Sequence, residues 1–334
     1  MGCPALAQEV LRNADGRYEE HSDFFGSGSA MFGPRAAQVA VGRSGRDLAL
    51  AHLKRVDVAG IVARYAGRNA WPRAGNAMLA EMTEGILTGP HRRAAFNRLR
   101  AQILATQILD REGPRPGRLH RAVRRFRWFR VFSAEREAFV DDGRPPRDLL
   151  DMLFAFGAGA STEKLIELYI AFNFALVGSL GFALGWTLYF AIAHDAAAHR
   201  PGDLIAESLR LSPVAWLLSR TVKAAHMLGG ERVTPGQEIW VFPYAVHRHA
   251  GTWEDPFAFS PERWIGRQDR SGWIPFGAGE HICAAISLTF QIVERILTEM
   301  LHGYRTSIVR IDGPSGTGPA LAPPRFVLEM IAQR

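Results

Sequence analysis

The chain contains little cysteine, with only Cys3 and Cys283 among 334 residues. Two cysteines cannot form the disulfide framework of a small secreted protein, and such a low count fits a reducing cytoplasm. Residues 1–4 lack the basic and apolar regions of a secretory signal peptide. Internal repeats, low-complexity tracts and long linkers are also missing. We therefore expect a cytoplasmic protein with a single domain over residues 1–334.

The composition is that of an ordinary globular protein, with 47% hydrophobic and 22% charged residues. The net charge is +7. Much of the excess lies in residues 111–136, where arginines alternate with aromatic residues. This segment could be a nucleic-acid patch or the solvated basic face of a helix, and we favour the helix, with no nucleic-acid partner. A basic surface would also steer an acidic electron-transfer partner.

Residues 170–193 form a run of 24 residues without a formal charge. A run of this length is a candidate membrane span, and a long helix buried in an α-helical domain is the alternative. The run contains Asn173, Ser179 and three glycines, and its flanking charges are mixed. No positive-inside bias appears. We expect a buried helix and no membrane span, chiefly because the motifs further along the chain describe a soluble fold that needs such a helix.

The spacing of apolar residues predicts the other elements. We expect helices over residues 4–12, 35–55, 75–108, 148–156, 161–194, 202–211 and 284–302, and a basic helix after the breaker at 113–117. Residues 220–246 alternate apolar and polar positions around a turn at 234–236, which is typical of short strands. Residues 247–282 are expected to be mostly irregular.

Cys283 lies in a glycine-rich loop, Phe276 to Cys283, directly before an apolar helical stretch. Glycines let a backbone approach a flat macrocycle, and N–H groups at a helix start favour a thiolate over a thiol. A buried structural cysteine is the alternative. The loop resembles the haem loop of the cytochrome P450 superfamily, Phe-x-x-Gly-x-x-x-Cys-x-Gly, except that Ala285 replaces the last glycine. The resemblance implies haem b, with Cys283 as the iron ligand and Phe276, Gly277 and Ala285 beside the cofactor.

Further motifs resemble the same family, in the same order. Glu207 and Arg210 resemble its Glu-x-x-Arg pair, and residues 253–264 resemble the meander that ends in Pro-Glu-Arg-Trp. In the family these form a structural triad, which here would be Glu207, Arg210 and Arg263. His247-Arg248 resembles another family run, usually written Tyr-x-x-His-Arg.

The resemblance also implies groups that bind the haem propionates. His281 and Arg220 match such positions, and cationic donors suit carboxylates. On the N-terminal side, Pro90-His91-Arg92-Arg93 looks like the family's basic-helix signature, but it lies too close to Ser179. We therefore place that helix at residues 34–54, with Arg43 or Arg46 near a propionate. The family's first helix and opening strands would then be missing.

The long helix departs from the family pattern, in which an acid-Thr pair delivers protons during oxygen activation. Ser179 falls at the alcohol position and Gly178 at the acid position, so a hydroxyl is kept and the carboxylate is lost. Water, polar groups of the substrate or Asn173 could deliver protons instead.

The resemblance predicts a mostly α fold with a small β portion, a triangular prism with haem between the long central helix and the cysteine loop. It implies a monooxygenase that oxidises an apolar small molecule in secondary metabolism, with electrons from an acidic ferredoxin-type donor. Residues expected to line the substrate pocket are Phe174, Ala175, Val177, Val214, Ala215 and Trp216. Rival interpretations are a redox-neutral or peroxide-driven haem enzyme and a non-catalytic auxiliary homologue, with a membrane protein ranked last. An uncovered sheet edge at the N-terminal side predicts a homodimer or an open substrate entrance.

Overall fold

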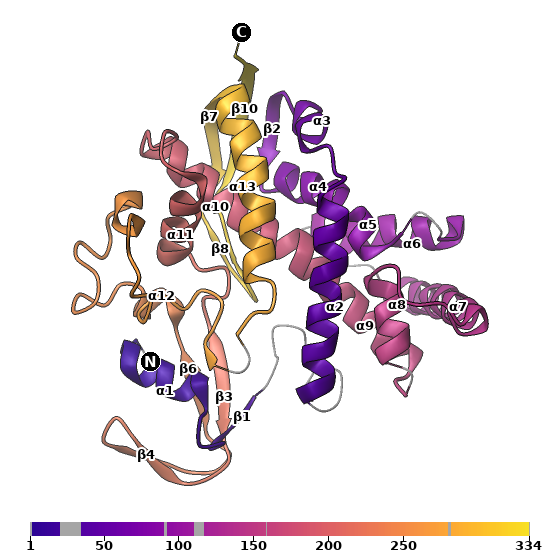
Figure 1. The fold of residues 1–334 in the computed structure, drawn as a ribbon, viewed down its shortest axis with the longest axis horizontal. Coiled ribbons are helices and arrows are strands. Elements are labelled where there is room, and N and C mark those ends of the chain that lie inside the picture. The colour runs from indigo at the N-terminus through magenta and orange to yellow at the C-terminus, as the bar shows by residue number, and fades with distance from the viewer. Residues whose placement is uncertain are drawn as a thin grey trace. The chain divides into compact units, whose positions relative to one another are not determined.

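A computed structural model describes residues 2–20, 35–89, 92–109, 117–157, 159–279 and 282–333. By backbone contacts the chain divides into two units. The first unit comprises Met1–Ser29, Val62–Gly75 and Phe182–Arg334. The second unit comprises Ala30–Ile61 and Asn76–Gly181. Each unit is described by itself, with elements labelled as in Figure 1.

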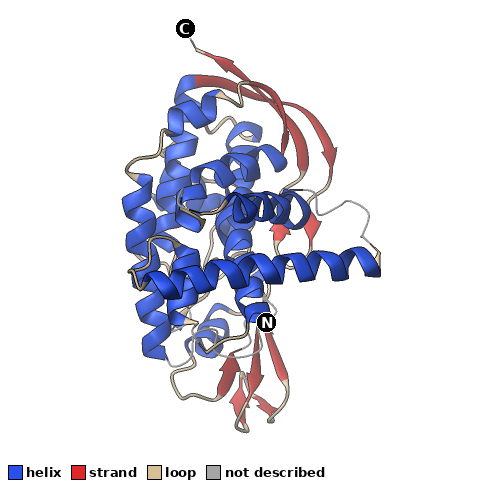
Figure 2. Cartoon of the chain, turned by 90° about the vertical axis from the view of Figure 1, so that its right-hand side faces the viewer, coloured by secondary structure: helices blue, strands red, loops and turns tan. Residues whose placement is uncertain are grey.

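The first unit holds the described strands (Figure 2). One antiparallel sheet has the order β1 (Tyr18–Glu20), β3 (Leu218–Val222) and β6 (Glu238–Val241). A second has the order β2 (Gly67–Trp71), β10 (Arg325–Ala332) and β7 (Tyr304–Gly313). Two hairpins complete the set: β4 (His226–Leu228) with β5 (Glu231–Val233), and β8 (Gly316–Thr317) with β9 (Leu321–Ala322).

The first unit also contains helices. They are α1 (Pro4–Arg12), most of α10 (Leu180–Ala193), α11 (Pro201–Leu211), α12 (Pro243–Val246), the 3-10 helix η4 (Pro261–Trp264) and α13 (Ile286–Gly303). Of these, α13 packs on β7. The apolar face of α1 covers the first sheet, and the buried cluster there consists mainly of Ala7, Val10, Leu11, Tyr18, Val222, Val241 and Ile274. In the second sheet Phe326 pairs with Trp71, and their rings stack with centroids 6.0 Å apart.

The described part of the second unit is helical. It contains α2 (Arg35–Leu53), α3 (Val58–Ala63), α4 (Arg73–Met82), α5 (Glu84–Leu87), α6 (Ala94–Ile103), the π-helix η2 (Leu104–Leu109), α7 (Arg118–Asp142), α8 (Leu149–Phe156), α9 (Thr162–Asn173) and the π-helix η3 (Phe174–Ser179), with the ends of α3 and α4 in the first unit. Three buried rings, Phe96, Phe132 and Tyr169, meet edge to face with centroids 5.3 to 5.5 Å apart. They join α6, α7 and α9 in one core.

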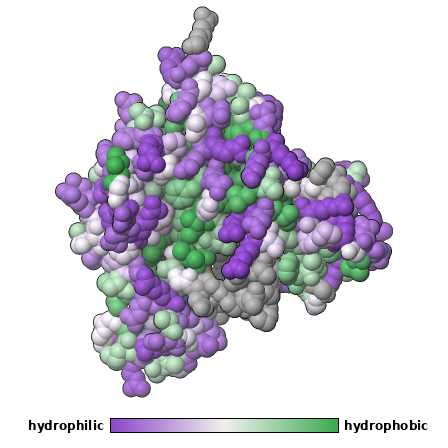
Figure 3. All heavy atoms as spheres, viewed as in Figure 1, coloured by the Kyte–Doolittle hydropathy of each residue, from purple (hydrophilic) through white to green (hydrophobic). Residues whose placement is uncertain are grey.

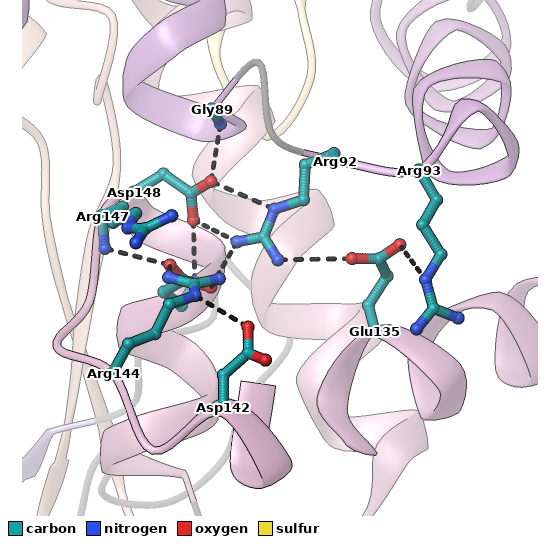
Figure 4. Close-up of polar contacts among 9 residues, drawn as sticks. Gly89, Arg92, Arg93, Glu135, Asp142, Arg144, Arg147 and Asp148 are labelled. Atoms are coloured by element: carbon teal, nitrogen blue, oxygen red, sulfur yellow. Dashed lines mark hydrogen bonds and ion pairs between the residues drawn. The ribbon is translucent and has the colours of Figure 1, made fainter. Parts of the chain in front are cut away.

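A buried charge cluster also holds the second unit together (Figure 4). Arg92 donates to Asp148 through Nε (3.1 Å) and Nη2 (2.5 Å) and to Asp151 through Nη2 (2.6 Å). Glu135 of α7 lies 3.4 Å from Nη1 of Arg92, and Arg144 forms an ion pair with Asp151. Asp148 also caps α8, because its Oδ1 accepts the N–H of Asp151 at 2.8 Å.

Most predicted helices are confirmed, including residues 4–12 and the long helix, which runs from Thr162 to Ala193. Two predictions need correction. Residues 75–108 form several helices with breaks at 83, 88–89 and 92–93, and residues 243–246 form the short helix α12 instead of a strand. Helix α3 and strands β1 and β2 were not predicted. The long helix is apolar enough to cross a membrane, but 67% of its most apolar window is buried, which supports the interpretation as a core helix.

Candidate functional site

The cysteine loop connects Ile274 to α13 and is shaped by two glycines. Gly277 and Gly279 have φ of +75° and +76°, a region that glycine occupies without strain. A Cβ on Gly279 would lie 2.5 Å from Cα of Arg12, so the loop packs directly against the end of α1. The N–H of Cys283 donates to the carbonyl of Phe276 at 3.0 Å, which closes the loop.

The sulfur of Cys283 lies at the N-terminal end of α13. The backbone N–H of Ala285 donates to Sγ at 3.4 Å. Cys283 keeps exposed surface as a residue, yet protein atoms surround the sulfur, and this burial raises the pKa of the thiol while the Ala285 N–H lowers it. The group is therefore a protonated thiol until a metal ion takes the place of its proton.

These residues fit a haem group. The donor is one sulfur at a helix start, beside the exposed residues Ile282 and Ala284, which give the loop an apolar outer face. Among the described residues no group of three or more His, Cys, Asp or Glu side chains could form an ordinary metal site. A single thiolate with an apolar surround suits a macrocycle that brings its own nitrogen ligands.

The predicted triad of Glu207, Arg210 and Arg263 is present in the first unit. Arg210 binds Glu207 through two hydrogen bonds, Nε to Oε2 at 2.9 Å and Nη2 to Oε1 at 2.8 Å, and both residues are fully buried. Nε of Arg263 donates to Oε1 of Glu207 at 3.0 Å. The indole N–H of Trp264 and the N–H of Ser260 also donate to this carboxylate, both at 2.9 Å.

Arg210 uses all five of its N–H donors. Two go to Glu207, and the other three go to the carbonyls of His247, Pro256 and Ala258 at 2.7 to 2.9 Å. These carbonyls belong to the irregular segment before η4. One buried guanidinium therefore fixes a long stretch of chain that has no strand or helix of its own.

His247 connects this cluster to the cysteine loop. Its Nδ1 donates to the carbonyl of Arg210 (3.0 Å), and its Nε2 accepts the N–H of Ile274 (2.8 Å). The contact at Nε2 requires the neutral imidazole, because a protonated Nε2 cannot accept a hydrogen bond. Burial lowers the pKa of His247 to about 3. The indole of Trp273 ties the same point to α11 by donating to the carbonyl of Ala206 at 3.1 Å. The sequence indicated a family resemblance at His247, but this positioning contact was not predicted.

The predicted propionate-binding residues fall in different places. Arg220 lies on β3, is buried, and donates from Nη1 to the carbonyl of Ser219 at 2.8 Å. His281 lies outside the described residues. Arg43 is exposed on α2 in the second unit. Arg92 belongs to the motif Pro90-His91-Arg92-Arg93, which lies too close to Ser179 to mark the basic helix. Its side chain lies in the carboxylate cluster of Figure 4. The propionate roles stay predictions.

The long helix changes to π-helical geometry at Phe174–Ser179, where Gly178 and Ser179 lie. Thr187 of the same helix donates to the carbonyl of Ala183 at 2.8 Å, as helical hydroxyls usually do. The Oγ of Ser179 is buried and has no hydrogen-bond partner within the described part of the chain. A Cβ on Gly178 would lie 2.9 Å from the ring of Phe174, so this ring occupies the space beside the glycine.

The predicted pocket residues belong to both units. Phe174 and Ala175 are half-buried and Val177 is fully buried, all on η3. Val214, Ala215 and Trp216 follow α11 in the first unit, where the carbonyl of Val214 accepts the N–H of Leu321 and the indole of Trp216 donates to Gly318, both at 2.9 Å. Their role as a substrate pocket stays a prediction.

Comparisons with known proteins agree with these motifs. The family model for cytochrome P450 matches residues 203–324. Cyclooctat-9-en-7-ol 5-monooxygenase of Streptomyces melanosporofaciens is 40% identical over 84 residues, 24% of this chain and 18% of that protein. Protopine 6-monooxygenase of Papaver somniferum is 31% identical over 108 residues, 30% of this chain and 20% of that protein. These alignments therefore span about a fifth of each relative's length.

Solved structures show the fold. CYP109B1 from Bacillus subtilis has a TM-score of 0.72 at 15% identity, with 99% of this chain and 92% of that chain covered. A zebra fish cytochrome P450 has a TM-score of 0.73 at 18% identity, with 100% and 92% covered. The fold prediction is confirmed.

Proposed function

Because this chain belongs to the cytochrome P450 family, we propose that it is a haem-thiolate monooxygenase that oxidises an apolar small molecule in secondary metabolism. The observation that carries the proposal is Cys283, held at the start of α13 in a loop that His247 and Trp273 fasten to α11. The family and fold imply a haem cofactor, and several relatives are named monooxygenases or hydroxylases.

When bound, a thiolate-ligated haem supplies the oxygen-activating chemistry, and the protein supplies binding, orientation and exclusion of water. Cys283 would hold the iron, while Arg220 and His281 would bind the propionates. The apolar side chains of Phe174 and Val177 on η3 would contact the substrate. The triad around Glu207 keeps the loop in shape and takes no part in the chemistry.

Ser179 is the group that would hold and pass a proton. Its buried hydroxyl has no partner among the described residues, so it is free to donate to a bound ligand or water. The position before it, Gly178, offers no carboxylate to supply that proton. This loss supports the second candidate, a redox-neutral or peroxide-driven haem enzyme, in which proton delivery to oxygen is not needed.

The net charge of +7 supports an acidic ferredoxin-type electron donor. The low cysteine count supports a cytoplasmic location. A homodimer that covers the N-terminal side stays a prediction. Among the described residues this side contributes α1 and the edge strand β1.

Two measurements test the proposal. The purified protein should give a reduced carbon-monoxide difference spectrum typical of a thiolate-ligated haem, and Cys283→Ala should abolish it. Cys3→Ala is the matched control, since Cys3 is the other free cysteine and is also exposed. Colourless, folded wild-type protein after expression with added haem would contradict the cofactor assignment.

Turnover then separates the two candidates. The monooxygenase requires oxygen, NADPH and a ferredoxin with its reductase. Product formed anaerobically without any reductant would establish the redox-neutral alternative.

A further inference from the structure

The N-terminal half of α7 is strongly basic. Residues 118–130 contain six arginines and one histidine and no acidic residue. Figure 2 shows α7 as the long helix across the front, with this half extending past the other helices of its unit. In the same half only Trp128 is buried and only Arg124 is partly buried, so most of these side chains contact solvent.

This half of α7 has a second apolar face, opposite to the one that packs on the core. With about 100° per residue, Leu119, Val123 and Phe126 fall on one line, and the buried Trp128 and Phe132 fall on roughly the opposite side. The three residues of this line, named the α7 ridge, are 79%, 51% and 62% exposed. Single exposed apolar residues are ordinary, but three in a row along one helix form a contact surface.

Arginines flank the α7 ridge on both sides. By the same helical spacing Arg118 and Arg125 lie along one edge and Arg127 along the other, and all three are exposed. On the face of the molecule in Figure 3, hydrophilic residues (purple) lie beside hydrophobic ones (green). The pattern ends in the C-terminal half, where Glu137 is exposed on the same side as the ridge. A solvated basic face explains the arginines but not the apolar residues between them.

We propose that the α7 ridge binds the surface of an anionic lipid bilayer. A helix that projects from its unit presents a convex ridge, which a deformable headgroup layer can accept without a matching groove. Apolar side chains would enter the boundary between headgroups and acyl chains, while the flanking guanidinium groups would bind lipid phosphates. A second copy of this chain is disfavoured as the occupant, because two such helices repel each other through their arginines.

The experiment is flotation of the purified full chain with vesicles, at low and high salt. Vesicles of phosphatidylcholine alone are compared with phosphatidylcholine and phosphatidylglycerol in about a two-to-one ratio. We expect binding to the anionic vesicles, a loss of at least about tenfold in the neutral ones, and a further decrease with salt.

Variants connect the binding to the ridge. Leu119→Ser with Phe126→Ser, and separately Arg125→Gln with Arg127→Gln, should each weaken binding at least about tenfold. Val140→Ser is the apolar control, since Val140 is 65% exposed on the same helix but beyond the basic half. Arg305→Gln, at an exposed position on β7, is the charge control.

Three results would overturn the proposal: no flotation with either vesicle, equal binding to both, or binding that the ridge variants leave unchanged. Absence of flotation together with binding to an acidic protein that the ridge variants abolish would assign the surface to a protein partner instead. Circular dichroism of each variant shows whether the fold is kept, and exposed positions should leave it unchanged.

Discussion

Among the described residues each unit contains a buried charge cluster, and these two clusters are built in opposite ways. In the first unit a single carboxylate, Glu207, binds two guanidinium groups, and the excess donors of Arg210 and Arg263 bind backbone carbonyls of irregular chain. In the second unit three carboxylates surround Arg92, and the excess acceptors take backbone N–H groups of Gly89, Arg147 and Asp151.

The difference follows from what each cluster has to hold. Backbone carbonyls are what an irregular segment leaves unpaired, so arginine can fix the chain around the cysteine loop. Free N–H groups are what a helix start leaves unpaired, so aspartate can fix the start of α8. The first cluster therefore positions a candidate site, while the second joins helices.

We expect the largest decrease in the free energy of unfolding for Glu207→Ala. Removing this carboxylate leaves the buried Arg210 and the partly buried Arg263 without the counter-ion that they share, which costs roughly 3–5 kcal/mol. Glu262→Ala is the matched control, because Glu262 is an exposed glutamate of the same segment. The free energy of unfolding from urea titration measures both. If the two variants unfold at the same urea concentration, the cluster does not stabilise the first unit as described.

For Arg92→Met we expect a smaller decrease in the free energy of unfolding, about 2–3 kcal/mol. Arg144 still pairs with Asp151 in this variant, and the N–H of Gly89 still binds Asp148. Arg93→Met is the control, since the Arg93 side chain is 57% exposed. Hydrogen exchange should show lost protection in α8 and unchanged protection in α11, and a loss in α11 instead would contradict the assignment of this cluster to the second unit.

These two clusters also show what the sequence could reveal. The Glu207 triad was predicted, because Glu207 and Arg210 are one helical turn apart and Arg263 closes a specific motif. The Arg92 cluster was not, because its members at 92, 135, 144, 148 and 151 have no common spacing and read as surface charges. Its partners come together only when α6, α7 and α8 pack.

The same limit applies to other elements. The helix over residues 4–12 was predicted within its exact bounds, because Pro4 and the apolar spacing mark it locally. Strand β2, Gly67–Trp71, has mostly exposed residues and no apolar alternation, and its partner β10 lies more than 250 residues away. The π-helical geometry at Ser179 has no signal in the sequence, although the residue itself was predicted as part of the site.

The two units should also differ in their response to acid. His247 has a pKa of about 3 in the fold against about 6.5 when unfolded. The unfolded chain therefore binds more protons below pH 6.5, and the stability of the first unit falls by up to about 1.4 kcal/mol per pH unit as the pH drops towards 3. The pKa of Asp151 is lowered by Arg144, Arg147 N–H and Arg92 against the effect of burial, so its contribution is lost only below about pH 4.

Urea titrations between pH 7 and pH 4.5 measure this difference. Tryptophan fluorescence reports mainly on the first unit, because Trp128 is the only one of the 8 tryptophans in the second unit. Its transition should move to lower urea by an amount worth about 2 kcal/mol, and His247→Gln should flatten this dependence. Equal pH dependence in the wild type and the variant would remove His247 as the cause.

The smallest effect on stability, and the sharpest test of function, comes from a pair of serines. Ser179 in the second unit and Ser208 in the first both have a buried hydroxyl that lacks a partner among the described residues. Replacing either by alanine removes an unpaired polar group, so each variant should change the free energy of unfolding by less than about 1 kcal/mol.

The two serine variants should differ in turnover. If Ser179 passes protons during catalysis, Ser179→Ala should lower the product formed per NADPH consumed by tenfold or more, a barrier change of about 1.4 kcal/mol, while Ser208→Ala should leave it unchanged. Equal coupling in both variants would remove Ser179 from the mechanism of proton delivery.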